Sequence, residues 1–261
     1  MSRKSLNRAR LTTYDLRLTT YFFMKPDLKF KRILFKVSGE AMMGDKAFGH
    51  ELQAINKICN QIISAHKLGC EICVVVGGGN IFRGVSQAAE GIERVTADYM
   101  GMLATCINGL ALQSALDKKN IDTRMLSAIP MNTICEPYIK RRAARHLEKG
   151  RVVIFSAGTG NPFFTTDTAA VLRAVEMGCD GILKGTQVDG VYSADPKIDK
   201  TATRYEKMKY IDVLKQDLKV MDQTAITLAK SNKLPIVVFS IKEENALQNV
   251  VQGQGKFTII N

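Results

Sequence analysis

The residues with the clearest chemical potential lie in Ser156–Asp167, which reads SAGTGNPFFTTD. Glycines, hydroxyls and a carboxylate gather there, where an apolar run gives way to a helix-like segment. A helix N-terminus presents unpaired N–H groups and the positive end of the helix dipole, and Gly158 and Gly160 let the backbone approach an anion. The stretch therefore predicts a phosphate-binding loop. The alternative is an ordinary strand-to-helix connection in which Thr166 or Asp167 caps the helix.

Two other apolar runs end in residues suited to phosphate. The first runs into Lys36–Glu40, which offers a cation and, at Ser38 and Gly39, close backbone donors. The second runs into Gly77–Gly84, where three glycines precede Arg83. A triple glycine alone also fits a tight turn, but three such loops at strand ends favour phosphate chemistry. The P-loop, dinucleotide-binding and protein-kinase motifs are absent from the sequence, which narrows the class of phosphate-handling protein.

The elements that must position these loops alternate between strand-like and helix-like segments from residue 31 onward. The patterns predict strands at 32–37, 71–76, 123–127, 151–155, 180–184, 236–240 and 257–260, and helices at 51–68, 98–116, 136–149, 168–177 and 221–231. Repeated alternation of this kind implies an α/β fold with a mostly parallel sheet and helices on both faces. Ligands of such sheets lie beyond the carboxyl ends of the strands, where the three loops fall.

Length and composition limit the functions open to the chain. Its 261 residues, 46% of them hydrophobic, can bury the core of a single large α/β domain. No apolar run approaches the roughly 20 residues that span a bilayer. The six cysteines lie mostly among apolar residues, and Cys70 and Cys73 should point to opposite faces of a strand, so we expect reduced core cysteines rather than a metal or redox pair. The three histidines are scattered. We therefore expect a cytoplasmic protein with no membrane partner and no dedicated metal site.

The net charge of +12 raises nucleic acid as a partner. Residues 1–32 hold nine Lys or Arg against two Asp, so most of the excess charge lies there. We interpret residues 1–28 as a basic arm, either flexible or a misassigned start, and residues 29–261 as a single domain. A second basic cluster at 140–145 falls in a helical segment, where a solvated or interface face is the simpler interpretation. Nucleic acid is therefore not the expected partner.

Six motifs follow one another along the chain. They are KVSGEA at 36–41, VVGGGNIFRG at 75–84, MGMLAT at 100–105, AGTGNPFFTTD at 157–167, VDGVY at 188–192 with ADP at 194–196, and LKVMD at 218–222. Together they resemble the bacterial uridylate kinases, a family of the amino acid kinase superfamily. The resemblance begins near residue 30 and leaves the basic arm outside. It implies a three-layer αβα sandwich and the ATP-dependent phosphorylation of UMP to UDP in pyrimidine nucleotide biosynthesis.

The resemblance also implies where UMP binds. It assigns UMP to Gly78, Arg83 and Asp98, and to the loop made of Thr159, Gly160, Asn161, Pro162, Phe163, Phe164, Thr165 and Thr166. The guanidinium of Arg83 can hold phosphate oxygens in a bidentate fork. Asp98 suits a ribose hydroxyl, with a helix N-cap as its alternative role. Phe163 and Phe164 either flank the uracil or fill the core.

The same resemblance places ATP and the catalytic groups. ATP would contact Lys36, Val37, Ser38, Gly39, Gly79 and Arg83 with its phosphates, and Thr186, Tyr192 and Asp195 on its adenosine side. Lys36 would neutralise the transferring phosphate, and Asp167 would orient Lys36. Lys184 and Asp222 are secondary candidates, whose alternatives are a solvent-facing strand end and a helix N-cap. Magnesium would arrive with ATP, bound mainly by phosphates and water.

Regulation and assembly are further implications of the resemblance. The segment Gly44, Asp45, Lys46, Ala47, Phe48 and Gly49 resembles the one linked to activation by GTP in bacterial relatives. The family also implies a homohexamer and inhibition by UTP. Gly185 and Gln187 depart from the alanine and the frequent lysine that the family leads us to expect. Two alternatives stay open: a kinase of the same superfamily acting on a carboxylate or carbamate, and a nucleotide-sensing or nucleic-acid-binding regulator.

Overall fold

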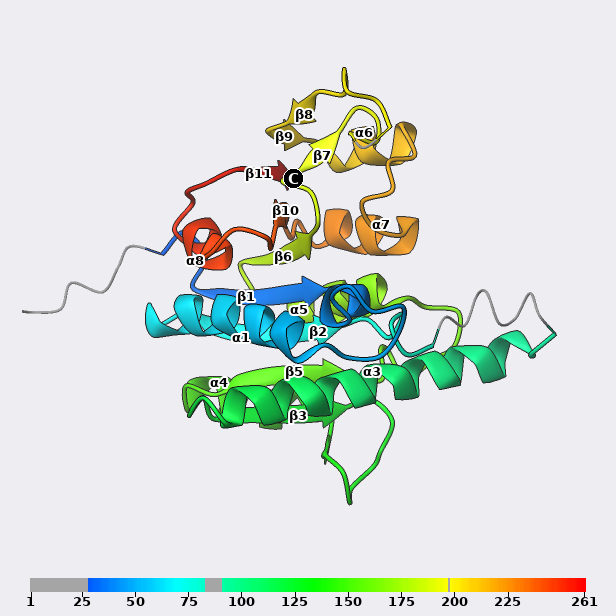
Figure 1. The fold of residues 1–261 in the computed structure, drawn as a ribbon, viewed down its shortest axis with the longest axis vertical. Helices are drawn as coiled ribbons and strands as arrows, with labels where there is room; N and C mark the ends of the chain where they lie inside the picture. Colours follow the sequence, from blue (N-terminus) through cyan, green and yellow to red (C-terminus); the bar gives the residue numbers. More distant parts are fainter. Residues whose placement is uncertain (1–27, 83–90, 197) are drawn as a thin grey trace, which may run out of the picture.

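A computed structural model describes residues 28–82, 91–196 and 198–261, and its centre is a large β-sheet (Figure 1). The strands of this sheet are β1 (Arg32–Val37), β2 (Glu71–Val76), β3 (Thr123–Ser127), β4 (Glu136–Pro137), β5 (Val152–Ser156), β6 (Gly181–Thr186), β9 (Lys207–Met208), β10 (Ile236–Ser240) and β11 (Phe257–Ile260). Over the described residues their order is β4-β3-β5-β2-β1-β6-β10-β11-β9. Neighbours run parallel except β10 and β11, which are antiparallel. The short strands β7 (Val191–Tyr192) and β8 (Arg204–Tyr205) pair separately.

Helices cover both faces of the sheet, which gives three layers (Figure 1). One face carries α1 (Leu52–Lys67), α3 (Arg94–Asp117) and α8 (Ala246–Val251). The other carries α4 (Lys140–Glu148), α5 (Thr166–Met177), α6 (Tyr210–Lys215) and α7 (Gln223–Ser231). A short 3-10 helix, η1 (Gly39–Met42), follows β1. The predicted fold class, an αβα sandwich around a mostly parallel sheet, is therefore confirmed.

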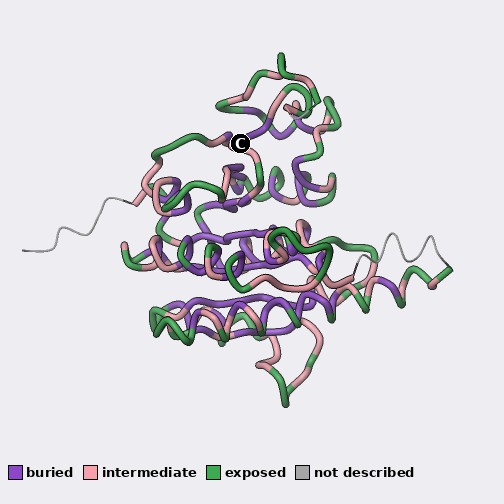
Figure 2. The backbone as a smooth tube through the Cα atoms, in the orientation of Figure 1, coloured by how far each residue is buried: buried purple, intermediate pink, exposed green. Residues whose placement is uncertain are grey.

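The side chains of the central strands alternate between two cores. On β1, Phe35 packs into the core under α1 and α3, whereas Leu34 packs into the core under α5. Both side chains are fully buried, and burying each contributes about 1.5–3 kcal/mol. Figure 2 shows the consequence as buried backbone along the strands, with exposed segments on the outer helices and loops. Because the side-chain period of a strand is two, Lys36 faces the same side as Leu34 and so points toward α5.

Several predicted boundaries are wrong for identifiable reasons. The predicted helix 136–149 begins as the edge strand β4, because Pro137 favours an extended residue before it, and the helix itself starts at Lys140. The predicted helix 98–116 starts four residues earlier, at Arg94. The elements α6, α8 and β7–β9 are too short for hydrophobic periodicity to reveal them. The strands at 32–37, 71–76, 123–127, 236–240 and 257–260 match their predictions residue for residue.

The cysteines are free thiols, and five of the six are buried. Cys70 belongs to the core under α1 and Cys73 to the core under α5, which confirms that they point to opposite faces of the sheet. The basic cluster at 140–145 lies on the exposed side of α4. Across the described part of the chain, no helix combines the length and the apolar character needed to cross a membrane.

We predict that Gly109→Ala lowers the free energy of unfolding by about 1–3 kcal/mol, because α3 packs too closely on the sheet to admit another methyl group. A Cβ at this position would lie 2.5 Å from Ser156 Oγ and 2.7 Å from Met125 Sδ. Gly101→Ala on the same helix is the control: no atom lies within 4 Å of its Cβ position, and alanine favours a helix. Urea unfolding of both variants measures the difference. Equal stabilities would contradict the packing described for α3.

Candidate active site

Lys36 and Lys184 stand side by side at the carboxyl ends of neighbouring strands. The parallel register of β1 and β6 pairs these two residues directly. Each lies two positions beyond a residue of the core under α5, so both side chains face that helix. Lys36 is only 7% exposed, and the Lys184 side chain is also largely buried. Like charges held so close in a partly dry site repel each other, so the arrangement requires an anion between them.

Asp167 is that anion. Its Oδ1 lies 2.5 Å from Lys36 Nζ and its Oδ2 lies 3.0 Å from Lys184 Nζ. Burial acts to raise the pKa of Asp167, but the two ammonium groups outweigh it and hold that pKa below its ordinary value. For Lys184, burial outweighs the attraction of Asp167 and lowers the pKa. When all three groups are ionised they leave one net positive charge at the end of the sheet, where an anionic ligand would be stabilised.

Lys184 is therefore not the solvent-facing strand end that formed one alternative for it. Besides its ion pair with Asp167, its ammonium group donates a hydrogen bond to the carbonyl of Val220. Val220 lies in the segment that leads into α7. The lysine thus connects β6 to both α5 and the approach to α7.

Thr165 and Asp222 fix the N-terminus of α5. Thr165, rather than either of the two residues after it, is the N-cap: its Oγ1 accepts hydrogen bonds from the backbone N–H groups of Asp167 at 3.0 Å and Thr168 at 3.4 Å. The hydroxyls of Thr165 and Thr168 both donate to Asp222. Asp222 in turn caps α7 by accepting a backbone N–H at 2.9 Å, as its N-cap alternative predicted. One carboxylate thus ties two helix N-termini together.

Glycines let the two loops that follow β1 and β2 touch each other. A Cβ on Gly39 would lie 2.5 Å from the carbonyl oxygen of Gly77 and 2.4 Å from Asn80 Oδ1, so no side chain fits there. Gly78 has a different neighbour: a Cβ would lie 2.8 Å from the carbonyl oxygen of Gly101 on α3. Gly79 belongs to the same turn. Close packing thus requires glycine at two of these positions.

Asp98 joins α3 to the loop before α5. It lies in the second turn of α3, so the N-cap alternative for it is wrong. Its Oδ2 accepts hydrogen bonds from the backbone N–H of Phe163 at 2.8 Å and from Arg94 Nε at 2.9 Å, and the Arg94 guanidinium lies 5.5 Å from the Phe163 ring centre. Phe163, at φ +70°, is 66% exposed, and Phe164 is also exposed. Neither ring fills the core, because Asp98 holds this backbone at the surface.

The rest of this loop turns back on itself. Thr159 Oγ1 accepts the backbone N–H of Asn161 at 3.1 Å, and Gly160, at φ +83°, lies against Ala128. Asn161 is exposed and Pro162 is half-buried. Thr166 is the first residue of α5. The loop therefore presents polar groups and aromatic rings to solvent beside the α5 N-terminus.

The other residues predicted to contact ATP lie on β6, in the β7–β8 excursion and at the end of β1. Thr186 ends β6, two residues beyond Lys184, and its hydroxyl donates to the carbonyl of Val188 at 2.6 Å. Tyr192 lies in the β7–β8 excursion, where a hydrogen bond to Asp189 raises the pKa of the phenol. Asp195 follows in the turn after β7. The Val37 side chain is buried in the core under α1, and its carbonyl accepts the backbone N–H of Gly77 at 3.0 Å. Arg83 lies outside the described residues.

The segment Gly44–Gly49 lies against the turn after β2. The backbone N–H of Gly49 donates to the carbonyl of Asn80 at 2.8 Å, and Asn80 Nδ2 donates to the carbonyl of Gly49 at 2.8 Å. Lys46 Nζ donates to the carbonyl of His50, while Phe48 is 77% exposed. Asn80 thus joins this segment to the turn after β2.

Asn80 and Asn108 are buried polar residues that sequence reasoning missed. Asn108 is fully buried on α3, and its Nδ2 donates to the carbonyl of Gly77 at 2.6 Å. An asparagine among apolar residues of a helix signals a buried hydrogen-bond partner, because an unpaired buried amide is costly. That signal is present in the sequence around Asn108, which reads CINGL.

Known proteins resemble this chain over most of its length. Residues 31–240 match the family model described as the amino acid kinase family. A uridylate kinase of Wolbachia pipientis wMel is 60% identical over 237 residues, covering 91% of this chain and 96% of the relative. One of Rickettsia bellii (strain RML369-C) is 58% identical over 237 residues, covering 91% and 99%. Among solved structures, the UMP kinase from Bacillus anthracis has a TM-score of 0.86 and 44% identity, covering 89% of this chain and 96% of that chain.

We predict that Asp167→Asn lowers the free energy of unfolding by about 3 kcal/mol at neutral pH, because both lysines lose their counter-charge. The folded-state pKa of Asp167 is lowered, so its stabilising contribution is complete above the ordinary carboxyl pKa of about 4. That contribution is lost as the pH falls through the lowered folded-state pKa. The stability gap between the wild type and the variant should therefore shrink in acid.

Urea unfolding at a series of pH values from about 7 to about 3 measures this gap. Asp217→Asn is a matched control, because Asp217 pairs with Lys219 on the surface and screening leaves such a pair little effect. A gap for Asp167→Asn that stays constant with pH would contradict the role given to its carboxylate.

Proposed function

The chain belongs to the amino acid kinase family and to its uridylate kinase branch, and on that premise we propose that it transfers the γ-phosphate of ATP to UMP. The observation that carries the proposal is the Lys36–Asp167–Lys184 cluster, which leaves net positive charge beside the strand-end loops. A phosphoryl group passing between two nucleotides carries several negative charges that such a site would stabilise. The products are UDP and ADP, and the reaction belongs to pyrimidine nucleotide biosynthesis.

We propose that UMP binds along the loop from Thr159 to Thr166, with Gly78, Arg83 and Asp98 completing the site. Three observations support this proposal. The loop leads into the N-terminus of α5, where backbone N–H groups favour phosphate. Asp98 is hydrogen-bonded to the loop backbone at Phe163, so it lies within reach of a ligand bound there. The exposed rings of Phe163 and Phe164 are free of the core and available to a base.

ATP is proposed to approach from the other side of the cluster. Its phosphates would contact Lys36, the backbone at Val37–Gly39, Gly79 and Arg83, and its adenosine would contact Thr186, Tyr192 and Asp195. The position of Thr186, two residues beyond Lys184 on β6, supports this side of the site. The two nucleotides would then meet above Lys36.

The proposed chemistry needs alignment more than it needs a base. The phosphate of UMP is largely ionised at neutral pH, so it can act as the nucleophile without losing a proton to the protein. Lys36 neutralises charge on the transferring group as the bond to ADP breaks and the bond to UMP forms. Asp167 holds the Lys36 ammonium in one position. Lys184 adds positive charge, and Asp222 acts at a distance by fixing the start of α5.

Magnesium is proposed to arrive with ATP, held mainly by phosphate oxygens and water. Both carboxylate oxygens of Asp167 face ammonium groups, and those of Asp222 accept hydrogen bonds from hydroxyls and a backbone N–H. These residues therefore fit a metal that the nucleotide carries better than a metal held by a protein cage. When bound, the ion would neutralise phosphate charge.

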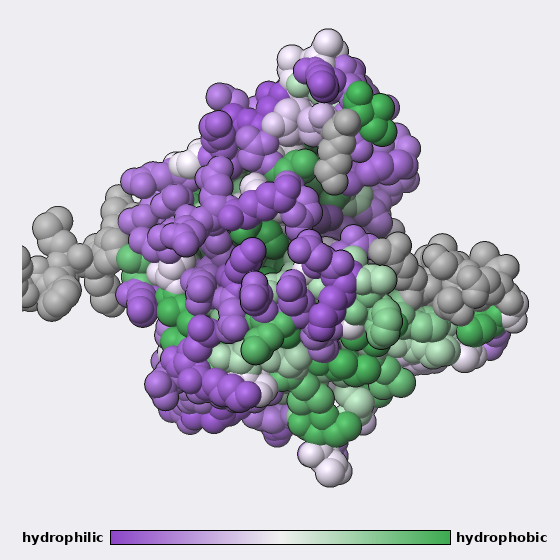
Figure 3. Space-filling view, in the orientation of Figure 1, coloured by the Kyte–Doolittle hydropathy of each residue, from purple (hydrophilic) through white to green (hydrophobic). Residues whose placement is uncertain are grey.

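We propose that the chain self-associates, as a homohexamer by resemblance to its family, in the cytoplasm. Support comes from α3, whose outer side bears a stripe of exposed apolar side chains. It begins with the neighbours Tyr99 and Met100 and continues at intervals of three or four residues with Leu103, Ile107 and Leu110. Figure 3 shows hydrophobic surface over the region of α3. Activation by GTP at Gly44–Gly49 belongs to the same proposal and is supported by the contact of that segment with the turn after β2. Inhibition by UTP is proposed by resemblance to the family alone.

A coupled assay that compares UMP, CMP, acetylglutamate and carbamate as acceptors tests the proposal. We predict that UMP is phosphorylated and that the two acids are not, and that Lys36→Ala reduces turnover at least about 100-fold. Activity confined to an acid substrate would overturn the proposal in favour of a carboxylate or carbamate kinase. A regulator is indicated if Lys36→Ala leaves function intact while deletion of residues 1–23 abolishes binding of nucleic acid.

A further inference from the structure

We infer that Asn108 and Asn80 are positioning residues, which lock the loops after β1 and β2 into the relative geometry that phosphoryl transfer requires. The inference rests on the proposed function and concerns a buried amide pair that the mechanism above does not use. Asn108 lies on α3 and is fully buried, and Asn80, in the turn after β2, is 2% exposed.

The two side-chain amides bond to each other in both directions. Asn108 Nδ2 donates to Asn80 Oδ1 at 2.7 Å, and Asn80 Nδ2 donates to Asn108 Oδ1 at 3.1 Å. Each amide has a second N–H, and each of these reaches a backbone carbonyl: Asn108 donates to Gly77 at 2.6 Å and Asn80 to Gly49 at 2.8 Å. Every side-chain N–H of the pair is thus used, so neither amide can rotate without leaving a buried polar group unpaired.

His50 completes the network at its half-buried end. Its Nε2 lies 2.6 Å from Asn108 Oδ1. The orientation of Asn108 is set by its donation to the Gly77 carbonyl, so the oxygen of this amide faces the histidine and His50 Nε2 is the donor. The network therefore links α3, the turn after β2 and the segment Gly44–Gly49.

The same network reaches the loop after β1 through close packing. A Cβ on Gly39 would clash with Asn80 Oδ1 and with the carbonyl oxygen of Gly77. Asn108 donates a hydrogen bond to each of these two oxygens, so it fixes the surface against which Gly39 packs. Moving either asparagine would shift one phosphate loop relative to the other. In-line transfer depends on that relative position, whereas ATP can still bind at Lys36–Gly39 and UMP at Thr159–Thr166.

Steady-state kinetics of the full-length chain with UMP and ATP tests the inference. For Asn108→Leu, which keeps the branched shape of the side chain and removes its polar atoms, we expect kcat to fall about 100-fold while KM for each nucleotide changes by less than about threefold. Asn80→Ala gives a second route if α3 does not tolerate leucine, with an expected loss of about tenfold in kcat.

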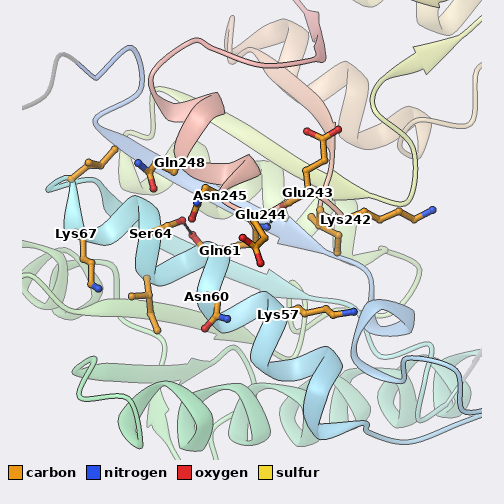
Figure 4. A pocket seen from close by; sticks show the side chains of 13 residues that line it. Lys57, Asn60, Gln61, Ser64, Lys67, Lys242, Glu243, Glu244, Asn245 and Gln248 are labelled. Carbon is orange, nitrogen blue, oxygen red and sulfur yellow. Dashed lines mark hydrogen bonds between the residues drawn. The ribbon is translucent and has the colours of Figure 1, made fainter.

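Gln61→Leu is the matched control. Gln61 is a similarly buried amide on α1 that donates to the carbonyl of Glu243 at 2.6 Å and accepts the N–H of Leu247 at 2.9 Å. Gln61 lines a cavity between α1 and α8, as Figure 4 shows. Neither of its two hydrogen bonds involves the turn after β2. We expect this variant to lower the melting temperature about as much as Asn108→Leu does and to keep kcat within about twofold.

The possible results distinguish a failure of the positioning role from a failure of the proposed function. If the asparagine variants keep the kcat of Gln61→Leu, or lose activity through KM alone, the inference is overturned although the proposed function stands. A wild-type protein that fails to phosphorylate UMP would overturn the proposed function itself. A loss of kcat specific to the asparagine variants supports the positioning role.

Discussion

Asp167 lies between Lys36 and Lys184, and three features of the fold act together to place it there. The parallel register of β1 and β6 sets the lysines side by side, and the two-residue period of the strands turns both toward α5. The N-cap Thr165 then starts α5 where the carboxylate of its second residue reaches both ammonium groups. Without that carboxylate, two positive charges would face each other in a site with little water, and their repulsion would drive the two lysine side chains apart.

The surrounding contacts maintain this arrangement from two sides. Asp222 joins the N-termini of α5 and α7, which keeps Asp167 at its height above the sheet. On the opposite face, the turn after β2 is held to α3 by buried amides and lies against the loop after β1. The Lys36–Asp167–Lys184 cluster supplies positive charge, and the loops around it set the relative position of the two nucleotides. A kinase of two nucleotides requires both, because charge without alignment does not speed transfer.

Much of this could be predicted from the sequence, because local patterns carry it. The β-branched apolar runs at 32–37 and 71–76 define their strands, and the small residues after them mark the loops. The loop before α5 was also recognisable, yet its N-cap was not, since Thr165, Thr166 and Asp167 are all good capping residues and only tertiary contact with Asp222 selects the first. Lys184 could not be paired with Lys36 before the strand order was known, because β6 is far from β1 in the sequence.

A double-mutant cycle on kcat tests most directly whether Asp167 and Lys36 act as one unit. The variants are Lys36→Met, Asp167→Asn and the two combined, assayed with saturating UMP and ATP. If Asp167 acts by holding Lys36, the double variant should lose about as much kcat as Lys36→Met alone, on the order of 1,000-fold, because the carboxylate then has no lysine to orient. Losses that multiply in the double variant would contradict this account, since they would mean that each group acts independently.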